Sequence, residues 1–205
     1  MNHLRGKFIV FDGGEGCGKS TQAKMLQAKL ESSGLHVVLV RDPGTTRVGE
    51  LIRAILLNPD HDEMGMRCEM LLYMSARAQM MVETILPALA QGKVVICDRF
   101  VSSTLSYQLG GDGLTADDIR KVAEIALKNR WPDLTVILDM PVEKSIARVK
   151  RAKDRIEQRP VEYHEQVRKN YLAQAKADPK RYRVVQADRD VDAVHGDILR
   201  AVTEA

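Results

Sequence analysis

Residues 8–21 read FIVFDGGEGCGKST, and this stretch decides the fold. Its first four residues are apolar, as in a short strand buried on both faces. Residues 13–20 then fit the pattern G-x-x-x-x-G-K-[ST]. Glycines at this spacing let successive backbone N–H groups converge on phosphate oxygens, and a helix that begins directly afterwards adds favourable partial charge. We therefore expect a strand, a phosphate-binding loop and a helix in succession, with a nucleoside triphosphate as ligand.

On the C-terminal side of this stretch, short apolar runs alternate with longer helical patterns. The runs are rich in Val and Ile and predict further strands at 37–40, 94–97, 135–138 and 183–185. The helical patterns cover 20–33, 49–57, 69–91, 116–128, 142–150, 161–177 and 192–203. This alternation predicts an α/β fold: a three-layer, doubly wound sandwich around a five-stranded parallel sheet, as in P-loop NTPases. No linker divides the chain, so we expect one domain over residues 1–205.

Composition and charge exclude several classes of protein. A chain of 205 residues with 44% hydrophobic and 29% charged residues is neither disordered nor fibrous. A net charge of +3 does not require a nucleic-acid partner. The three cysteines, Cys17, Cys68 and Cys97, are too far apart for metal-ligand spacing and odd in number, which favours a reducing compartment. With no apolar run near ~18 residues and no signal peptide, we expect a cytoplasmic protein without a membrane partner.

Polar residues at the ends of the predicted strands suggest a catalytic site. Lys19 would span the β- and γ-phosphates, and Ser20 would offer its hydroxyl to Mg²⁺. Asp98 ends the strand at 94–97 and could hold Mg²⁺ directly or through water, with the anion-binding Arg99 beside it. Asp139 also ends a strand, but we interpret it as a residue that begins a turn or caps the next helix.

Two features each allow two interpretations. Cys17 lies at a helix N-terminus near Lys19, where a thiol pKa can fall, but the sequence suggests no histidine partner, so a packing role is favoured over a catalytic thiolate. Residues 148–159 hold six basic and two acidic residues. This segment is either a solvated helix face or a lid over the phosphates, and its place after the fourth strand favours the mobile lid.

The phosphate loop alone does not identify the class of P-loop protein. A GTPase should carry an N-K-x-D motif, which this chain lacks, and a motor or recombinase is normally longer. A kinase of small molecules needs a second, arginine-rich anion pocket and a lid that excludes water. Candidate arginines for that second pocket are Arg41, Arg53, Arg77 and Arg99. A small-molecule kinase is therefore the favoured class.

Six sequence blocks resemble the thymidylate kinase family, whose members phosphorylate dTMP. The blocks are FDGGEGCGKST (11–21), RDPGTT (41–46), LLYMSARAQ (71–79), VICDRFVSSTLSYQ (95–108), PDLTVILD (132–139) and DRIEQ (154–158). They follow the family's order and approximate spacing over nearly the whole chain. The resemblance implies transfer of the γ-phosphoryl group of MgATP to dTMP, giving dTDP and ADP in dTTP synthesis, by a homodimeric enzyme.

The resemblance also implies the site residues. For ATP they are Gly13, Gly14, Glu15, Gly16, Cys17, Gly18, Lys19, Ser20, Thr21 and Arg148. For dTMP they are Glu15, Asp42, Pro43, Arg53, Tyr73, Arg77, Arg99, Thr104, Tyr107 and Gln108. The implied catalytic residues are Lys19, Arg99, Arg155 and Glu15, and the implied ligands of Mg²⁺ are Ser20 and Asp98.

Several of these roles are specific in the family. Tyr73 would stack on thymine, although by itself it could equally be a core aromatic of an amphipathic helix. Arg77, four residues later on the same helix face, would bind the base. The Tyr107 ring would disfavour a ribose 2′-hydroxyl. Arg99 would bridge the donor and acceptor phosphates, and Arg155 would reach the transferring group from the lid.

The chain departs from the family pattern at three positions. Asp42 replaces a glutamate, and Thr45 replaces a glycine, a change that disfavours a positive φ in the turn. Asp112 stands where relatives often carry an arginine, so no contact is transferred to it. Two rival functions stay open from the sequence. One is a kinase of another pyrimidine monophosphate, and the other is a regulatory P-loop ATPase with a protein or DNA partner.

Overall fold

The predicted strands form one parallel sheet. The computed structural model describes residues 1–150 and 152–204. Within them the strands are β1 (Phe8–Gly13), β2 (Val37–Arg41), β3 (Val94–Asp98), β4 (Leu134–Asp139) and β5 (Tyr182–Gln186). Their order across the sheet is β2-β3-β1-β4-β5, and every pairing is parallel. The predicted α/β class with a five-stranded parallel sheet is confirmed.

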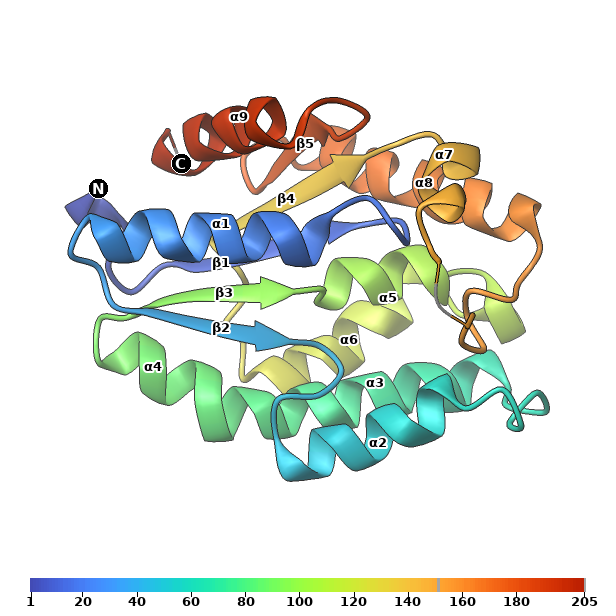
Figure 1. Cartoon of the computed structure of the whole chain (residues 1–205). Coiled ribbons are helices and arrows are strands. Elements are labelled where there is room, and N and C mark those ends of the chain that lie inside the picture. The colour runs from blue at the N-terminus through green and yellow to red at the C-terminus, as the bar shows by residue number, and fades with distance from the viewer. Residues whose placement is uncertain (151, 205) are drawn as a thin grey trace.

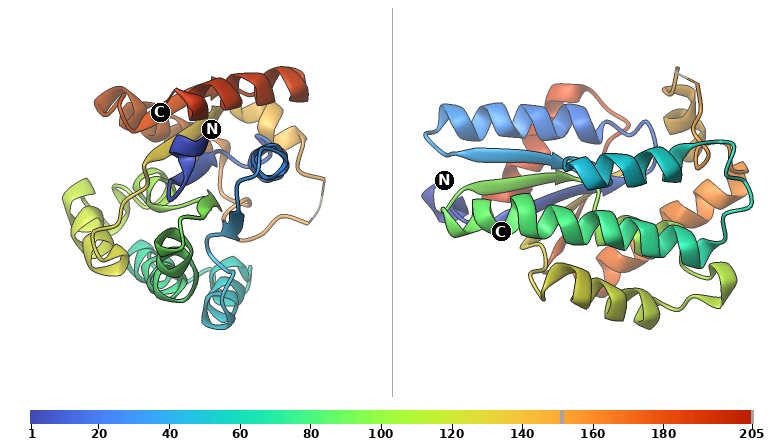
Figure 2. Two further views of the ribbon diagram at one scale, coloured as in Figure 1. Left: turned by 90° about the vertical axis from the view of Figure 1, so that its left-hand side faces the viewer. Right: turned by 90° about the horizontal axis from the view of Figure 1, so that it is seen from below.

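Helices cover both faces of the sheet, as Figures 1 and 2 show. Their bounds are α1 (Lys19–Ser32), α2 (Arg47–Leu57), α3 (Met66–Met80), α4 (Leu86–Ala90), α5 (Val101–Tyr107), α6 (Ala116–Leu127), α7 (Val142–Ala147), α8 (Val161–Ala177) and α9 (Val191–Thr203). Helices α1 and α9 pack on one face, and α3 to α6 pack on the other. No helix in the described part of the chain is long and apolar enough to cross a membrane.

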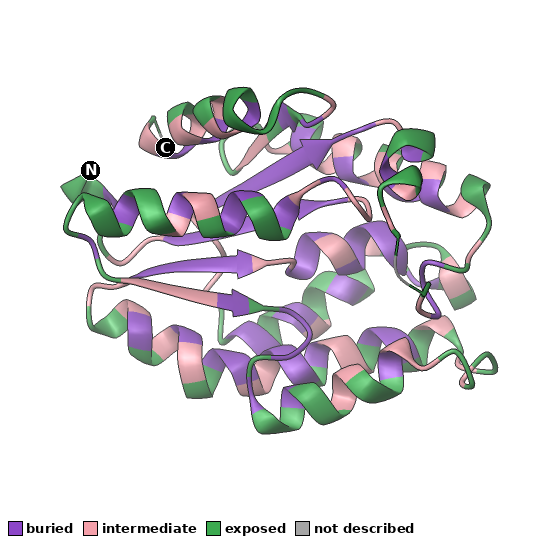
Figure 3. Ribbon diagram, in the orientation of Figure 1, coloured by how far each residue is buried: buried purple, intermediate pink, exposed green. Residues whose placement is uncertain are grey.

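The central strands are buried on both faces, which explains their continuous apolar sequence. In β1, Ile9 and Phe11 belong to the core beneath α1 and α9, whereas Phe8 and Val10 belong to the core on the opposite face. Side chains alternate between the two faces along a strand, so an apolar run without polar residues fills both cores. Figure 3 shows β1, β3 and β4 as buried along almost their whole length.

The helix predicted over 69–91 is present as one helical run from residue 66 to residue 90, but a π turn divides it. Helix α3 ends at Met80, a π-helical turn covers Met81–Ile85, and α4 follows. Pro87 has no N–H to donate, and its ring would collide with the carbonyl four residues earlier in a regular helix. A widened turn before the proline accommodates it. Helix α7 likewise ends at Ala147 rather than at residue 150.

The carboxyl ends of β1, β2 and β3 lie at one edge of the sheet, where the arrowheads point in Figure 1. The loops and helix starts that follow these strands carry several of the residues that the sequence predicted for the site, including Glu15, Lys19, Asp42 and Arg99. Ligands of open α/β sheets bind at this edge, so the fold brings the predicted residues to the expected place.

Candidate active site

The phosphate loop connects β1 to α1. Gly16 has a φ of 70°, and a Cβ built on it would lie 2.1 Å from the carbonyl oxygen of Ser145, so only glycine fits. The Lys19 ammonium folds back along the loop, where it donates hydrogen bonds to the carbonyl oxygens of Gly13 at 3.2 Å and Gly14 at 2.6 Å. Cys17 is buried and donates to the Gly14 carbonyl at 3.0 Å, which favours its packing interpretation.

The two residues predicted for Mg²⁺ lie together beside this loop. The Ser20 hydroxyl donates to Asp98 Oδ2 at 2.5 Å, which joins the start of α1 to the end of β3. A hydroxyl and a carboxylate beside a phosphate loop are suitable oxygen ligands for a hard cation. Asp139 is instead held by Arg168 at 2.7 and 2.9 Å and by Gln186 at 3.2 Å. Its predicted structural role fits these contacts, although it does not cap α7.

A cleft beside the loop collects most residues predicted for ATP. Its lining includes Glu15, Gly16, Gly18, Lys19, Ser20, Thr21, Asp98, Arg99 and Arg148. Gly13 and Gly14 line a smaller cavity behind the loop. We call the cleft the donor pocket.

A second pocket adjoins the first and is called the acceptor pocket. All ten residues predicted for dTMP line it: Glu15, Asp42, Pro43, Arg53, Tyr73, Arg77, Arg99, Thr104, Tyr107 and Gln108. Sequence reasoning missed four further lining residues, which are Leu57, Ser103, Asp154 and Ile156. Three of them, Ser103, Asp154 and Ile156, lie inside the sequence blocks 95–108 and 154–158 that carry the family resemblance.

Four residues, Glu15, Asp42, Arg53 and Arg99, line both pockets, and we call the ion pair of Glu15 and Arg99 the shared wall. The Arg99 guanidinium pairs with the Glu15 carboxylate, which also accepts a hydrogen bond from the Tyr107 hydroxyl at 3.1 Å. Burial opposes ionisation of Glu15, but the charges of Arg99 and Lys19 outweigh it and lower its pKa to about 2. Arg99 itself has a φ of 71°, an uncommon backbone conformation for a non-glycine residue. The Glu15–Arg99 pair thus places a negative and a positive charge between the two pockets, which Asp42 and Arg53 also line.

Arg77 forms the buried floor of the acceptor pocket. Its Nε donates to Asp42 Oδ2 at 2.7 Å, and both side chains are 1% exposed. Its guanidinium also contacts Thr104 at 3.4 Å and lies 5.0 Å from the centre of the Phe100 ring. Burial raises the pKa of Asp42, although Arg77 opposes that shift. Asp42 Oδ1 has no hydrogen-bond partner in the described part of the chain.

The turn after β2 keeps a positive φ despite the glycine-to-threonine departure. Thr45 has a φ of 68°, and the Asp42–Pro43 peptide bond is cis. The Thr45 hydroxyl accepts from the Arg41 N–H at 2.8 Å and donates to the Arg41 carbonyl at 3.0 Å, while the Thr45 N–H donates to Glu50 at 2.8 Å. These hydrogen bonds offset the energetic cost of a positive φ at a threonine, so the replacement of glycine by Thr45 does not prevent the turn.

Arg155 is the one predicted catalytic residue that the structure does not bring to the phosphate loop. It is buried and pairs with Glu69 of α3, and its Nε donates to the Leu56 carbonyl at 3.0 Å. Arg159 pairs with the same carboxylate at 2.8 Å. A buried carboxylate with two arginine partners is the physical reason why Arg155 points toward α3 and away from the loop.

The segment predicted as a lid is therefore anchored at its C-terminal part. The Arg155 N–H donates to the Leu57 carbonyl at 3.3 Å, and Ile156 is buried in the wall of the acceptor pocket. Arg148 lines the donor pocket, while Arg151 lies outside the described residues.

Two buried carboxylates were missed by sequence reasoning. Glu69 accepts from Arg155, Arg159 and, at 2.6 Å, from Gln108. Asp12 ends the apolar part of β1 and is fully buried. Each is an acidic residue inside an otherwise apolar pattern, which is the signal that could have revealed both.

Comparisons with known proteins agree with this geometry. A family model described as thymidylate kinase matches residues 11–198. The chain is 48% identical to the thymidylate kinase of Pelotomaculum thermopropionicum, over 98% of this chain and 94% of that protein. It is 44% identical to that of Caldanaerobacter subterraneus subsp. tengcongensis, over 98% and 97%. The crystal structure of thymidylate kinase from Ehrlichia chaffeensis superimposes with a TM-score of 0.78 at 31% identity, covering 97% of this chain and 99% of that one. This chain belongs to the thymidylate kinase family, and it is a kinase.

Proposed function

We propose that the protein transfers the γ-phosphoryl group of MgATP to dTMP, giving dTDP and ADP. The observation that carries this proposal is the pair of adjoining pockets that share Glu15 and Arg99. Direct transfer needs two phosphate groups to meet at one point, with positive charge where they meet. The phosphate loop supports a nucleotide donor on one side of the wall, and the pocket around Tyr73 and Arg77 supports a base-bearing acceptor on the other.

In the proposed reaction, an oxygen of the dTMP phosphate attacks the γ-phosphorus in line with the departing ADP. The attacking phosphate is already ionised, so no strong general base is required and positioning dominates. Lys19 would bind the β- and γ-phosphates of ATP, and Arg99 would bind phosphate oxygens of both the donor and the acceptor. Glu15 would orient Arg99 and approach the acceptor's sugar and phosphate.

The Ser20 and Asp98 oxygens would hold Mg²⁺ beside the triphosphate. The bound ion would supply charge neutralisation at the phosphate oxygens. Their 2.5 Å contact supports this assignment because both ligands lie within reach of one position at the donor pocket.

Acceptor selectivity follows from the acceptor pocket. Tyr73 and Arg77 would contact the base, and the Tyr107 ring lies near the expected sugar position. One methyl group in an apolar pocket contributes only about 1–3 kcal/mol to discrimination. We therefore expect dTMP to be preferred, dUMP to be intermediate, and UMP and CMP to be poor acceptors.

A coupled ADP-release assay with dTMP, dUMP, UMP, CMP and AMP tests the proposal. Equal or better turnover of UMP or CMP would favour the rival kinase of another pyrimidine monophosphate, and equal turnover of AMP would contradict a pyrimidine acceptor. The second rival, a regulatory ATPase, predicts slow ATP hydrolysis that a protein or DNA stimulates and dTMP does not. The extensive acceptor pocket beside the phosphate loop favours the kinase.

Three further properties belong to this proposal. The enzyme would be a homodimer of single-domain subunits whose partners are ATP and dTMP, without nucleic acid or membrane. It would work in the cytoplasm, which the free state of Cys17, Cys68 and Cys97 supports. The lid predicted over residues 148–159 would not move as a whole, because Arg155 and Arg159 are anchored to α2 and α3.

A further inference from the structure

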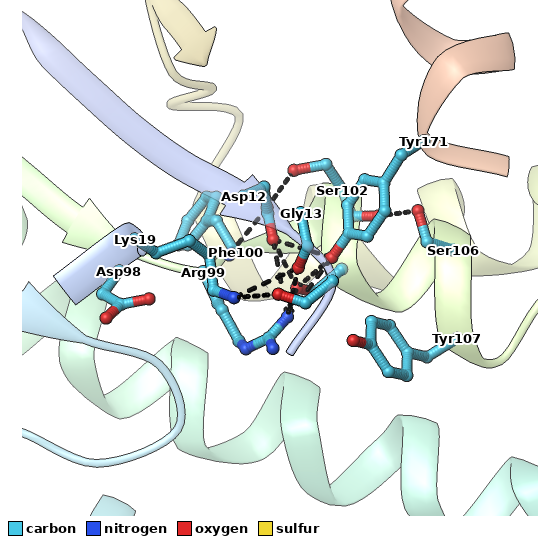
Figure 4. Close-up of polar contacts among 12 residues, drawn as sticks. Asp12, Gly13, Lys19, Asp98, Arg99, Phe100, Ser102, Ser106, Tyr107 and Tyr171 are labelled. Atoms are coloured by element: carbon cyan, nitrogen blue, oxygen red, sulfur yellow. Dashed lines mark hydrogen bonds and ion pairs between the residues drawn. The ribbon is translucent and has the colours of Figure 1, made fainter. Parts of the chain in front are cut away.

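Asp12 is a buried carboxylate that the proposed mechanism does not use. It is 0% exposed and lies at the end of β1 behind the shared wall (Figure 4). Its Oδ1 accepts hydrogen bonds from the Ser103 hydroxyl at 2.5 Å and the Tyr171 hydroxyl at 2.9 Å. Its Oδ2 accepts from the Ser102 hydroxyl and from the Phe100 N–H at 3.3 Å. Donors from the start of α5 and from α8 therefore converge on one buried charge.

The two hydroxyls on Oδ1 also contact Arg99. Arg99 Nη1 lies 3.2 Å from Ser103 Oγ and 3.4 Å from the Tyr171 oxygen, and it donates to the Gly13 carbonyl at 3.1 Å. Asp12 Oδ1 itself is 4.0 Å from Nη1. The other terminal nitrogen, Nη2, pairs with Glu15 at the shared wall. One side of the guanidinium is thus held from behind, and the other faces the pockets.

The carboxylate determines which way the hydroxyl protons point. An ionised carboxylate only accepts hydrogen bonds, so Asp12 Oδ1 draws the hydroxyl protons of Ser103 and Tyr171 toward itself, while these two hydroxyls, 2.8 Å apart, can also share a hydrogen bond with each other. Burial raises the pKa of Tyr171 well above its usual value, so its hydroxyl keeps the proton it donates. The hydroxyl lone pairs are then left for Arg99, which only donates. A hydroxyl proton turned from Asp12 toward Arg99 would instead meet a guanidinium N–H.

We propose that Asp12 is a positioning residue that fixes the Arg99 guanidinium at the shared wall through the hydroxyls of Ser103 and Tyr171. The inference rests on the proposed function, because Arg99 has a catalytic task only where two phosphate groups meet. Asp12 does not touch either pocket's ligand in this scheme. It acts by keeping Nη1 in place while Nη2 exchanges Glu15 for phosphate oxygens.

A purely structural role for Asp12 makes a different prediction. Asp12 joins β1 to α5 and α8, so its loss could simply loosen their packing. Ser102 provides a matched control, because its hydroxyl binds Oδ2 whereas the hydroxyls that contact Arg99 bind Oδ1. Removal of either serine hydroxyl deletes one hydrogen bond to the same carboxylate. Only the Ser103 hydroxyl also supports Arg99.

The test measures kcat, KM for dTMP and ATP, and Tm for Asp12→Asn, Ser103→Ala, Tyr171→Phe and Ser102→Ala. In Asp12→Asn the amide can donate to the hydroxyls and turn their protons toward Arg99, so kcat should fall about ten- to a hundred-fold with little change in KM. Ser103→Ala and Tyr171→Phe should each lower kcat, and Ser102→Ala should not. Asp12→Glu, which keeps the acceptor-only group, should retain more activity than Asp12→Asn.

Each outcome bears on one of the two proposals. Full kcat in Asp12→Asn, or equal kcat losses in Ser102→Ala and Ser103→Ala, would overturn the positioning role while leaving the kinase assignment intact. If Asp12→Asn does not fold, the three hydroxyl variants decide. A wild-type protein that prefers another monophosphate would contradict the proposed substrate, and the same comparison is then made with that acceptor.

Discussion

The ammonium of Lys19 rests on two carbonyl oxygens of the phosphate loop, and a bound triphosphate would compete for it. Its charge counts most when negative charge moves between the transferring oxygens. Lys19→Ala should therefore lower kcat by about a hundred-fold or more while the protein stays folded. Steady-state kinetics with a circular dichroism melt checks this. Lys29→Ala, an exposed lysine on the same helix, is the control and should keep wild-type kcat.

The depressed pKa of Glu15 predicts a pH-dependent contribution to stability. Its pKa of about 2 in the folded protein lies below the ordinary value of 4.5. Its ionised form therefore stabilises the fold above about pH 4.5, and this stabilisation is lost as the pH falls toward 2. A shift of this size corresponds to roughly 3 kcal/mol.

Urea unfolding of wild type and Glu15→Gln at several pH values measures that contribution. The difference in unfolding free energy should be constant between pH 7 and pH 5 and should shrink below the ordinary carboxyl pKa. If the difference in unfolding free energy instead grows as the pH falls, the ion pair with Arg99 does not stabilise the ionised form of Glu15.

At the scale of elements, Glu69 joins α3 to the segment that follows α7. One carboxylate with no exposed surface serves Arg155, Arg159 and Gln108. Removing its charge leaves two arginines without their buried partner, which should cost about 3–5 kcal/mol of unfolding free energy in Glu69→Gln. Chemical denaturation measures this loss. Glu83→Gln, an exposed acid on the following π turn, should change stability by less than about 0.5 kcal/mol.

Arg155→Ala distinguishes the two positions proposed for this side chain. If Arg155 stays with Glu69, its removal should lower stability and weaken dTMP binding together, because Asp154 and Ile156 line the acceptor pocket. If it moves to the phosphates during turnover, kcat should fall with dTMP affinity unchanged. Calorimetric dTMP affinity and kcat measured on one preparation separate the two results.

Sequence reasoning predicted the strands and most helices because their patterns are local. The apolar runs and the phosphate loop are defined by residues that are neighbours in the chain. The positive φ of Thr45 was not expected, because the hydrogen bonds with Arg41 and Glu50 that stabilise it leave no recognisable pattern in the sequence. The position of the Arg155 side chain depends on its ion pair with Glu69, which is 86 residues away in the chain. Such a long-range ion pair leaves no periodicity in the sequence.

At the scale of the whole molecule, two neighbouring helices and the π turn after them expose apolar side chains. On α2, Val48, Leu51 and Ile55 recur at helical spacing and are 46%, 61% and 43% exposed. Leu71 of α3 is 51% exposed and Val82 of the π turn is 42% exposed. Helices α2 and α3 pack against each other. Exposed apolar side chains that gather on one part of a surface are typical of association sites.

We therefore expect the proposed homodimer to form through the exposed surface of α2 and α3. Introducing a charge there buries it unpaired in the interface, so Leu51→Glu and Leu71→Glu should shift the protein from dimer to monomer. Val191→Glu alters an exposed apolar residue of similar exposure, 50%, on α9 and should remain dimeric. Sedimentation velocity over a range of protein concentrations measures the assembly state of all four proteins. A monomeric wild type at micromolar concentration, or a dimer that survives both glutamate substitutions, would exclude this surface as the interface.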